Sequence, residues 1–145
     1  MSDTVTSLDP LTLPLQGSQL IEASAGTGKT FTIALLYVRL MLGHGQSHPD
    51  LSEGLMPPNL LVVTFTEAAT KELRDRIRSR LTEAADLFAE DPADVDISEQ
   101  VGDPLLRLRN EYPINQWPGC RRQLQLAAEW MDEAAVSTIH GWCNR

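Results

Sequence analysis

The apolar positions of this chain fall into short blocks that predict alternating strands and helices. Three runs rich in apolar or β-branched residues predict buried strands, at residues 18–23, 60–65 and 134–139. Residues 31–42 are apolar on nearly every side and are followed by Gly43. This pattern predicts a buried helix with glycine at its C-terminal cap.

A long amphipathic helix is predicted for residues 69–88. Its apolar side chains recur at steps of three or four, at Ala69, Leu73, Ile77, Leu81, Ala84 and Phe88. The Lys and Arg residues between positions 71 and 80 lie outside this apolar stripe, and the simplest interpretation is that they form a solvated face of the helix. Residues 120–131 predict a further helix. Residues 91–118 form an acidic, proline-punctuated region in which a short helix fits residues 105–109.

The order of these elements indicates an α/β fold with a parallel sheet and crossover helices. Three strands are fewer than a complete sheet of this class has, and the sequence stops soon after the third. We therefore expect the sheet to be incomplete at the C-terminal end.

Composition adds limits on the class of protein. The 145 residues suit one domain, and 12 basic against 20 acidic residues give a net charge of −8. No uncharged apolar run reaches the roughly 18 residues that cross a bilayer. The N-terminus lacks the basic start and apolar core of a secretory signal. Two cysteines, Cys120 and Cys143, are too few for a disulfide framework. We expect a soluble cytoplasmic protein with reduced thiols and no membrane contact.

The acidic charge is unevenly distributed. Between Glu83 and Glu111, nine acidic residues face only Arg107 and Arg109. Nearly all of the net negative charge therefore lies in this segment. Bulk charge neither favours nor excludes a nucleic-acid partner.

Residues 23–30 read ASAGTGKT, between a predicted strand and a predicted helix. Gly26 and Gly28 let the backbone approach a ligand closely, and the N-terminus of the helix favours phosphate. The Lys29 ammonium can reach the β- and γ-phosphates, while the Thr30 hydroxyl can occupy one position on Mg²⁺. The loop predicts binding of a nucleoside triphosphate by Ala23, Ser24, Ala25, Gly26, Thr27, Gly28, Lys29 and Thr30.

Polar and aromatic residues follow the second and third predicted strands. Phe65 and Thr66 end one, whereas Thr138 and His140 end the other. The carboxyl ends of parallel strands meet at one edge of a sheet, where the phosphate loop also lies. Polar groups there can contact phosphates, and Phe65 can stack on a base, as on a surface that binds single-stranded nucleic acid. Taken alone, His140 is also consistent with a histidine that is hydrogen-bonded at a strand end, and Phe65 is also consistent with a core residue.

Together the three segments resemble motifs I, Ia and Ib of superfamily 1 helicases of the UvrD/Rep kind. The matching stretches are ASAGTGKT, TFTEAATKELRDRI and STIHGWC. Two more specific features are Glu22, directly before the first stretch, and the sequence His-Gly-Trp-Cys in the third. With these features the motifs are similar to those of the RecB-like group, the beta subunits of bacterial exodeoxyribonuclease V.

The resemblance implies a P-loop NTPase (RecA-like) fold in which residues 1–145 form the N-terminal part of the first motor domain. It implies ATP and Mg²⁺ as cofactors, with Lys29 and Thr30 catalytic and Thr30 on the metal through ATP. Single-stranded DNA contacts are implied for Phe65, Thr66, Thr138 and His140.

The whole protein implied by the resemblance is a 3′–5′ helicase motor of a helicase–nuclease. It acts on double-stranded DNA ends in recombinational repair, with RecC-like and RecD-like subunits in a heterotrimer. The remaining motor motifs and the nuclease would follow Arg145. We therefore expect the 145-residue chain by itself neither to hydrolyse ATP appreciably nor to unwind DNA.

Other interpretations stay open at this stage. They are an AddA-type or Rep-like helicase, and a nucleotide-binding module without catalysis. A small P-loop kinase is disfavoured, because Arg107, Arg109, Arg121 and Arg122 lack the setting of an arginine-rich lid. No residue is assigned to the base of the nucleotide.

Overall fold

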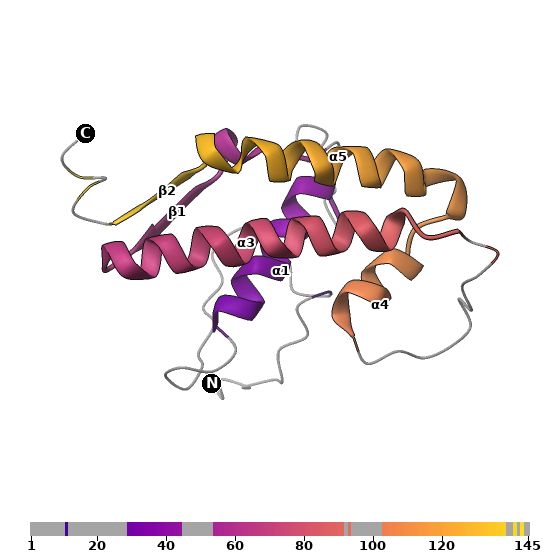
Figure 1. Cartoon of the computed structure of the whole chain (residues 1–145), viewed down its shortest axis with the longest axis horizontal. Helices are drawn as coiled ribbons and strands as arrows, with labels where there is room; N and C mark the ends of the chain where they lie inside the picture. The colour runs from indigo at the N-terminus through magenta and orange to yellow at the C-terminus, as the bar shows by residue number, and fades with distance from the viewer. Residues whose placement is uncertain are drawn as a thin grey trace, which may run out of the picture.

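The computed structural model describes residues 11, 29–44, 54–91, 93, 103–138, 141 and 143. The longest helix packs against a two-stranded sheet, and the other helices pack on that helix (Figure 1). The elements in chain order are α1 (Lys29–Leu42), η1 (Pro57–Asn59), β1 (Leu61–Thr64), α3 (Glu67–Phe88), α4 (Pro104–Asn110), η3 (Ile114–Gln116), α5 (Trp117–Glu129), η4 (Trp130–Glu133) and β2 (Ala135–Thr138). The strand predicted for residues 18–23 and the loop at residues 23–28 lie outside the described residues.

Helix α1 confirms the predicted buried helix and begins within the phosphate-loop motif. Tyr37, Val38 and Met41 are almost fully buried, as expected for a helix that is apolar on most sides. At its end Gly43 has a φ of 74°, a conformation that glycine adopts without strain. The next N–H, that of His44, donates to the carbonyl of Arg39 at 2.9 Å. The predicted glycine cap is therefore confirmed.

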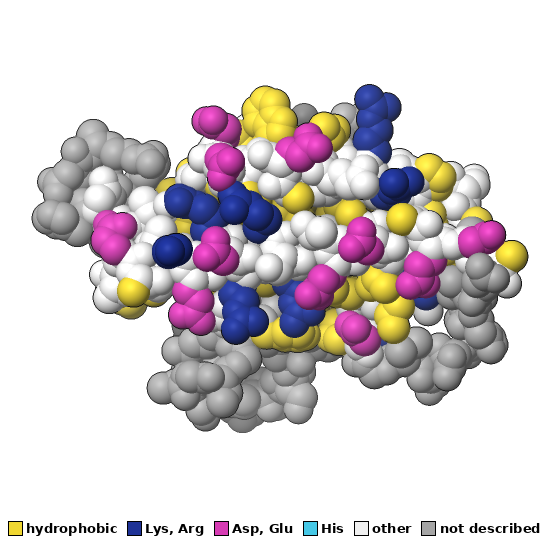
Figure 2. All heavy atoms as spheres, viewed as in Figure 1, with side chains coloured by type: hydrophobic (Ala, Val, Ile, Leu, Met, Phe, Trp, Pro, Cys, Tyr) yellow, Lys and Arg dark blue, Asp and Glu magenta, His cyan; other side chains and the backbone are white. Residues whose placement is uncertain are grey.

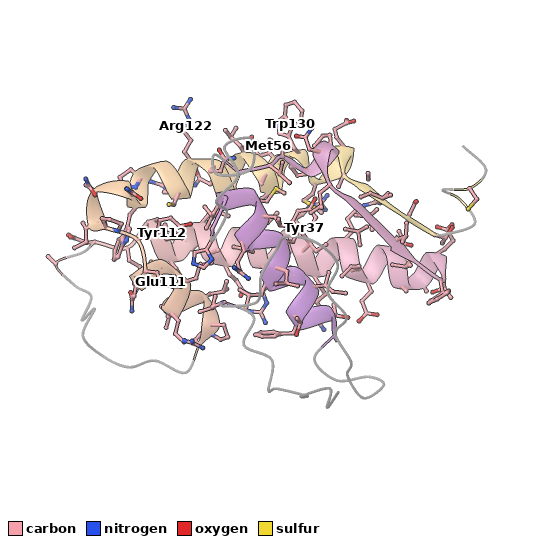
Figure 3. The ribbon with its side chains drawn as sticks, turned by 180° about the vertical axis from the view of Figure 1, so that it is seen from behind. Tyr37, Met56, Glu111, Tyr112, Arg122 and Trp130 are labelled. Carbon is pink, nitrogen blue, oxygen red and sulfur yellow. The ribbon has the colours of Figure 1, made fainter. Side chains whose placement is uncertain are left out.

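Helix α3 is the long helix around which the other helices pack. Its predicted apolar stripe is buried from Leu73 onward, with Ile77 and Leu81 completely so, whereas Ala69 is only partly buried. Helices α1 and α5 both pack on it. Figure 1 shows α1 passing behind α3, and Figure 3, from the opposite side, shows α1 in front. This stripe, buried between two helices, forms the α3 part of the hydrophobic core.

The two described strands pair in parallel. Their register runs from Leu61 opposite Ala135 to Thr64 opposite Thr138. The connection between them passes through α3, α4 and α5. The predicted α/β class, with parallel strands joined by a helical crossover, is confirmed for this part of the chain. Both strands end beside the start of α3 (Figure 1).

The acidic region contains more helix than its sequence pattern predicts. Helix α4 covers the short helix expected there, and Asp103 caps it by accepting from the N–H of Leu105 at 3.0 Å. Helix α5 begins at Trp117, three residues before the predicted start. The earlier start is possible because Pro118 lies in the first turn of the helix, where its missing N–H has no partner to lose.

The remaining coarse predictions concern cysteines and membrane spans. Cys120 is buried, Cys143 is exposed, and both are free thiols. Burial raises the pKa of the Cys120 thiol to about 11, so this thiol stays protonated at neutral pH. Among the helices within the described ranges, none combines the length and apolar character needed to cross a bilayer.

Candidate functional site

The start of α1 is the described part of the predicted nucleotide site. Lys29 and Thr30 are its first two residues, and the first turn carries no acidic residue. The positive end of the helix dipole is therefore not neutralised by a side chain of that turn, which suits a phosphate. Thr30 is partly exposed. These features fit Mg·ATP. The predicted contacts of Ala23, Ser24, Ala25, Gly26, Thr27 and Gly28 lie outside the described residues, as does the side chain of Lys29.

The ends of the two strands form the described part of the predicted DNA site. Because Thr64 lies opposite Thr138 in a parallel pair, both strands end at the same edge of the sheet. Phe65 follows directly and is 89% exposed, the highest value among the large apolar residues described. Thr66 is exposed as well. The structure therefore brings together the two predicted strand ends, while His140 lies outside the described residues.

Hydrogen bonds hold the turn that presents Phe65. The hydroxyls of Thr64 and Thr70 contact each other, and Thr70 donates to the carbonyl of Thr66 at 3.0 Å. The Thr66 hydroxyl in turn accepts from the N–H of Ala69 at 3.0 Å and caps α3. The Phe65 backbone therefore lies between a strand and a helix start that are tied together, although its ring packs against almost nothing.

Thr138 is positioned differently from Phe65 and Thr66. It is only 7% exposed, and its hydroxyl accepts from the N–H of Gly141 at 2.9 Å. A Cβ added at Gly141 would come within 2.9 Å of that hydroxyl oxygen, so any other residue there would displace the Thr138 side chain. Thr138 therefore holds the turn that follows β2.

Two arginines of α3 bind to residues in β2 and in the 3-10 turn that precedes it. Arg74 donates to the carbonyl of Val136 at 2.9 Å, and Arg78 pairs with Asp132 at 2.5 Å. Arg74 is partly buried, and its buried Nε has no partner among the described residues. The interpretation of the whole basic run as a solvated face is therefore wrong for Arg74. No local pattern could have shown this, because Arg74 and Val136 are 62 residues apart.

Charge of one sign does not dominate the visible face of the molecule. Figure 2 shows Lys and Arg side chains interspersed with Asp and Glu over α3 and α5. Part of this mixture is paired, as in the contact of Arg80 with Glu83 at 2.8 Å. On this face the described residues therefore offer individual placed basic groups and no broad basic surface.

Comparison with known proteins identifies the family of this chain. Residues 6–145 match the UvrD/REP helicase N-terminal domain. The RecBCD enzyme subunit RecB of Escherichia coli (strain K12) is 52% identical over all 145 residues, which span 11% of that protein. The protein of the same name from Haemophilus influenzae is 44% identical over 145 residues, or 12% of its length. That from Chlamydia trachomatis is 36% identical over 137 residues, covering 92% of this chain and 12% of the relative.

Both levels of the predicted resemblance are thus confirmed. The family match extends over nearly the whole chain, including the two strand ends and the start of α1. The similar proteins named RecB are all much longer than 145 residues. The chain belongs to the UvrD/REP helicase N-terminal domain family.

Proposed function

We propose that this chain forms part of the first motor domain, with a RecA-like sheet, of an ATP-dependent 3′–5′ DNA helicase. The observation that supports the proposal is the parallel register of Thr64 and Thr138, which ends both strands at one edge of the sheet, where the exposed Phe65 directly follows β1. A contact surface for a strand of DNA needs such convergence of separate segments at one edge of a sheet. Family membership supports the same conclusion.

In this proposal, ATP binds at the start of α1. The backbone of residues 23–28 surrounds the phosphates, Lys29 contacts the β- and γ-phosphates, and Thr30 provides an oxygen for Mg²⁺. Bound ATP supplies the phosphoanhydride bond whose hydrolysis drives movement of the helicase along DNA. The chain's own contribution is to orient the triphosphate at a helix end whose first turn lacks acidic residues.

Single-stranded DNA lies in this proposal across the carboxyl ends of β1 and β2. Phe65 stacks on a base, and the Thr66 and His140 side chains contact the sugar–phosphate backbone. Thr138 contributes mainly through the turn that its hydroxyl holds, because only 7% of the residue is exposed. This division of roles follows from exposure, since a buried hydroxyl that already accepts a hydrogen bond has little surface left for a ligand.

The proposal extends to the longer proteins that this chain resembles. Its relatives named RecB are described as subunits of the RecBCD enzyme. We infer a helicase–nuclease that acts on double-stranded DNA ends in recombinational repair, with RecC-like and RecD-like partner subunits.

A comparison of Lys29→Ala with Lys71→Ala tests the proposal in the complete gene product that carries this sequence. Lys71 is exposed on α3 and serves as the matched control. We expect DNA-stimulated ATP hydrolysis and unwinding of a fluorophore-labelled duplex to fall by on the order of 100-fold in Lys29→Ala. Both should persist in Lys71→Ala. Unchanged hydrolysis in Lys29→Ala would show that ATP is bound elsewhere. ATP binding without turnover in the unmodified protein would favour a non-catalytic module.

A further inference from the structure

Trp130 is an exposed aromatic residue at the junction of α5 and η4. It is 49% exposed, whereas the next residue, Met131, is fully buried and anchors η4 in the core. The 3-10 turn η1 packs against η4, and Figure 3 shows Met56, directly before η1, on the same side of the molecule as Trp130. Pro58 of η1 is exposed as well. We call Met56, Pro58 and Trp130 the Trp130 patch.

Acidic side chains flank the Trp130 patch. Glu129, Asp132 and Glu133 are all exposed, and Figure 2 shows Asp and Glu side chains on both sides of the hydrophobic group that projects where α5 meets η4. Asp132 pairs with Arg78, but neither Glu129 nor Glu133 has an ion pair within the described residues. No Lys or Arg occurs in residues 123–138, nor in η1 or β1. The surroundings of the ring therefore carry an excess of negative charge.

The Trp130 ring lacks the kind of cation that covers two other aromatic rings of this chain. The guanidinium carbon of Arg80 lies 4.6 Å from the centroid of the Phe31 ring. That of Arg109 lies 5.1 Å from the centroid of the Trp117 ring. In the part of the chain that the structure describes, no Lys or Arg covers Trp130 in this way. Because tryptophan attracts a cation more strongly than the other aromatic side chains, this ring can accept one from outside.

We propose that the Trp130 patch docks a basic segment of another protein chain. An Arg or Lys side chain of that segment stacks on the Trp130 ring, and its charge is complementary to the carboxylates of Glu129 and Glu133. Tryptophan is among the residues that contribute most to protein interfaces, and apolar neighbours such as Met56 and Pro58 exclude water from such a contact. DNA does not fit this surface, because the carboxylates repel its phosphates.

Two peptides test the charge of the docked side chain. A fluorescein-labelled peptide of alternating arginine and glycine is titrated with the complete gene product, and fluorescence anisotropy gives the dissociation constant. The same peptide with citrulline in place of arginine keeps the shape of the side chain without its charge. We expect Trp130→Ala to raise the dissociation constant of the arginine peptide about fivefold, as loss of one cation–π contact predicts, and to leave that of the citrulline peptide unchanged.

Neutralisation of the acidic side chains tests charge complementarity without a change in the ring. The combined variant Glu129→Gln and Glu133→Gln should weaken binding of the arginine peptide about threefold, and added salt should reduce this effect. Both side chains are exposed, so the variant should keep the stability of the unmodified protein. The matched control is Glu72→Gln, an exposed acidic residue of α3, which should leave peptide binding unchanged.

Comparison of Trp130→Ala with Phe65→Ala separates this surface from the strand ends. Trp130→Ala should weaken binding of the arginine peptide but not of a labelled oligothymidine, and Phe65→Ala should do the reverse. Normal binding of the arginine peptide by Trp130→Ala would overturn the inference, as would failure of the unmodified protein to bind that peptide. A loss of oligothymidine affinity in Trp130→Ala would overturn it in favour of a DNA contact. A smaller oligomer of Trp130→Ala in sedimentation would overturn it in favour of a second copy of the chain.

Discussion

Replacement of Phe65 by alanine should separate DNA binding from folding. Phe65 is 89% exposed. A phenylalanine side chain that is fully buried removes about 200 Å² from water. About a tenth of this area is buried at Phe65. At about 25 cal/mol per Å², the loss of apolar burial in Phe65→Ala costs about 0.5 kcal/mol.

The expected loss in DNA binding is larger than this change in stability. One base stacked on an aromatic side chain contributes about 1–3 kcal/mol, which corresponds to an affinity decrease between about 5-fold and 150-fold. The two quantities therefore differ by enough to be resolved in one variant.

The assay pairs two measurements on the complete gene product. Fluorescence anisotropy with a labelled oligothymidine gives the dissociation constant at one fixed salt concentration, because phosphate contacts make affinity salt-dependent. A urea titration gives the free energy of unfolding. Trp130→Ala is the control, since Trp130 is an aromatic residue, 49% exposed, that precedes β2 and lies away from the strand ends (Figure 3).

Two results would contradict this reasoning. An unchanged dissociation constant in Phe65→Ala would show that the exposed ring does not contact DNA. A loss of affinity in Trp130→Ala as large as that in Phe65→Ala would show that exposed aromatic residues bind DNA without regard to the strand ends.

Two further predictions concern a helix cap and a histidine. Thr66→Ala removes the hydroxyl that accepts from the N–H of Ala69 and should lower the free energy of unfolding by about 1 kcal/mol, whereas Thr66→Asp should retain the cap. Urea titration of both variants measures this difference. Equal stability of Thr66→Ala and the unmodified protein would contradict the prediction. The second prediction is a loss of stability in acid that depends on His44. Burial lowers the pKa of His44 below its ordinary value of 6.5, although the nearby Glu111 opposes this shift. His44 also accepts a hydrogen bond from Arg39 at Nδ1, at 2.9 Å, and protonation there would break that bond. Below pH 6.5 the unfolded chain binds more protons at His44 than the folded chain, so stability falls as pH drops. Urea midpoints at pH 7.5 and 5.5 should show a larger decrease in the unmodified protein than in His44→Gln, and equal decreases would refute the assignment.

Several features of the fold could be predicted because they depend on neighbours in sequence. The stripe of α3 follows from spacing alone, since residues three or four apart share a helix face. Gly43 and Thr66 act within one turn of a helix end, so their capping roles follow from their chemistry. The parallel pairing of β1 and β2 followed from a strand–helix–strand order, for which a helical crossover is the usual connection.

The sequence by itself thus determined most of the elements in the described residues, their order, the resemblance to helicase motifs and the edge at which two of those motifs meet. The tertiary structure decided which side chains are available there. It buries Thr138 and exposes Phe65, although Thr138 ends β2 and Phe65 directly follows the end of β1. It also joins Arg74 to Val136 and Arg80 to Phe31. Those contacts depend on how α3 packs against β2 and α1, and helix packing is set by the shape of whole surfaces, which local periodicity does not encode.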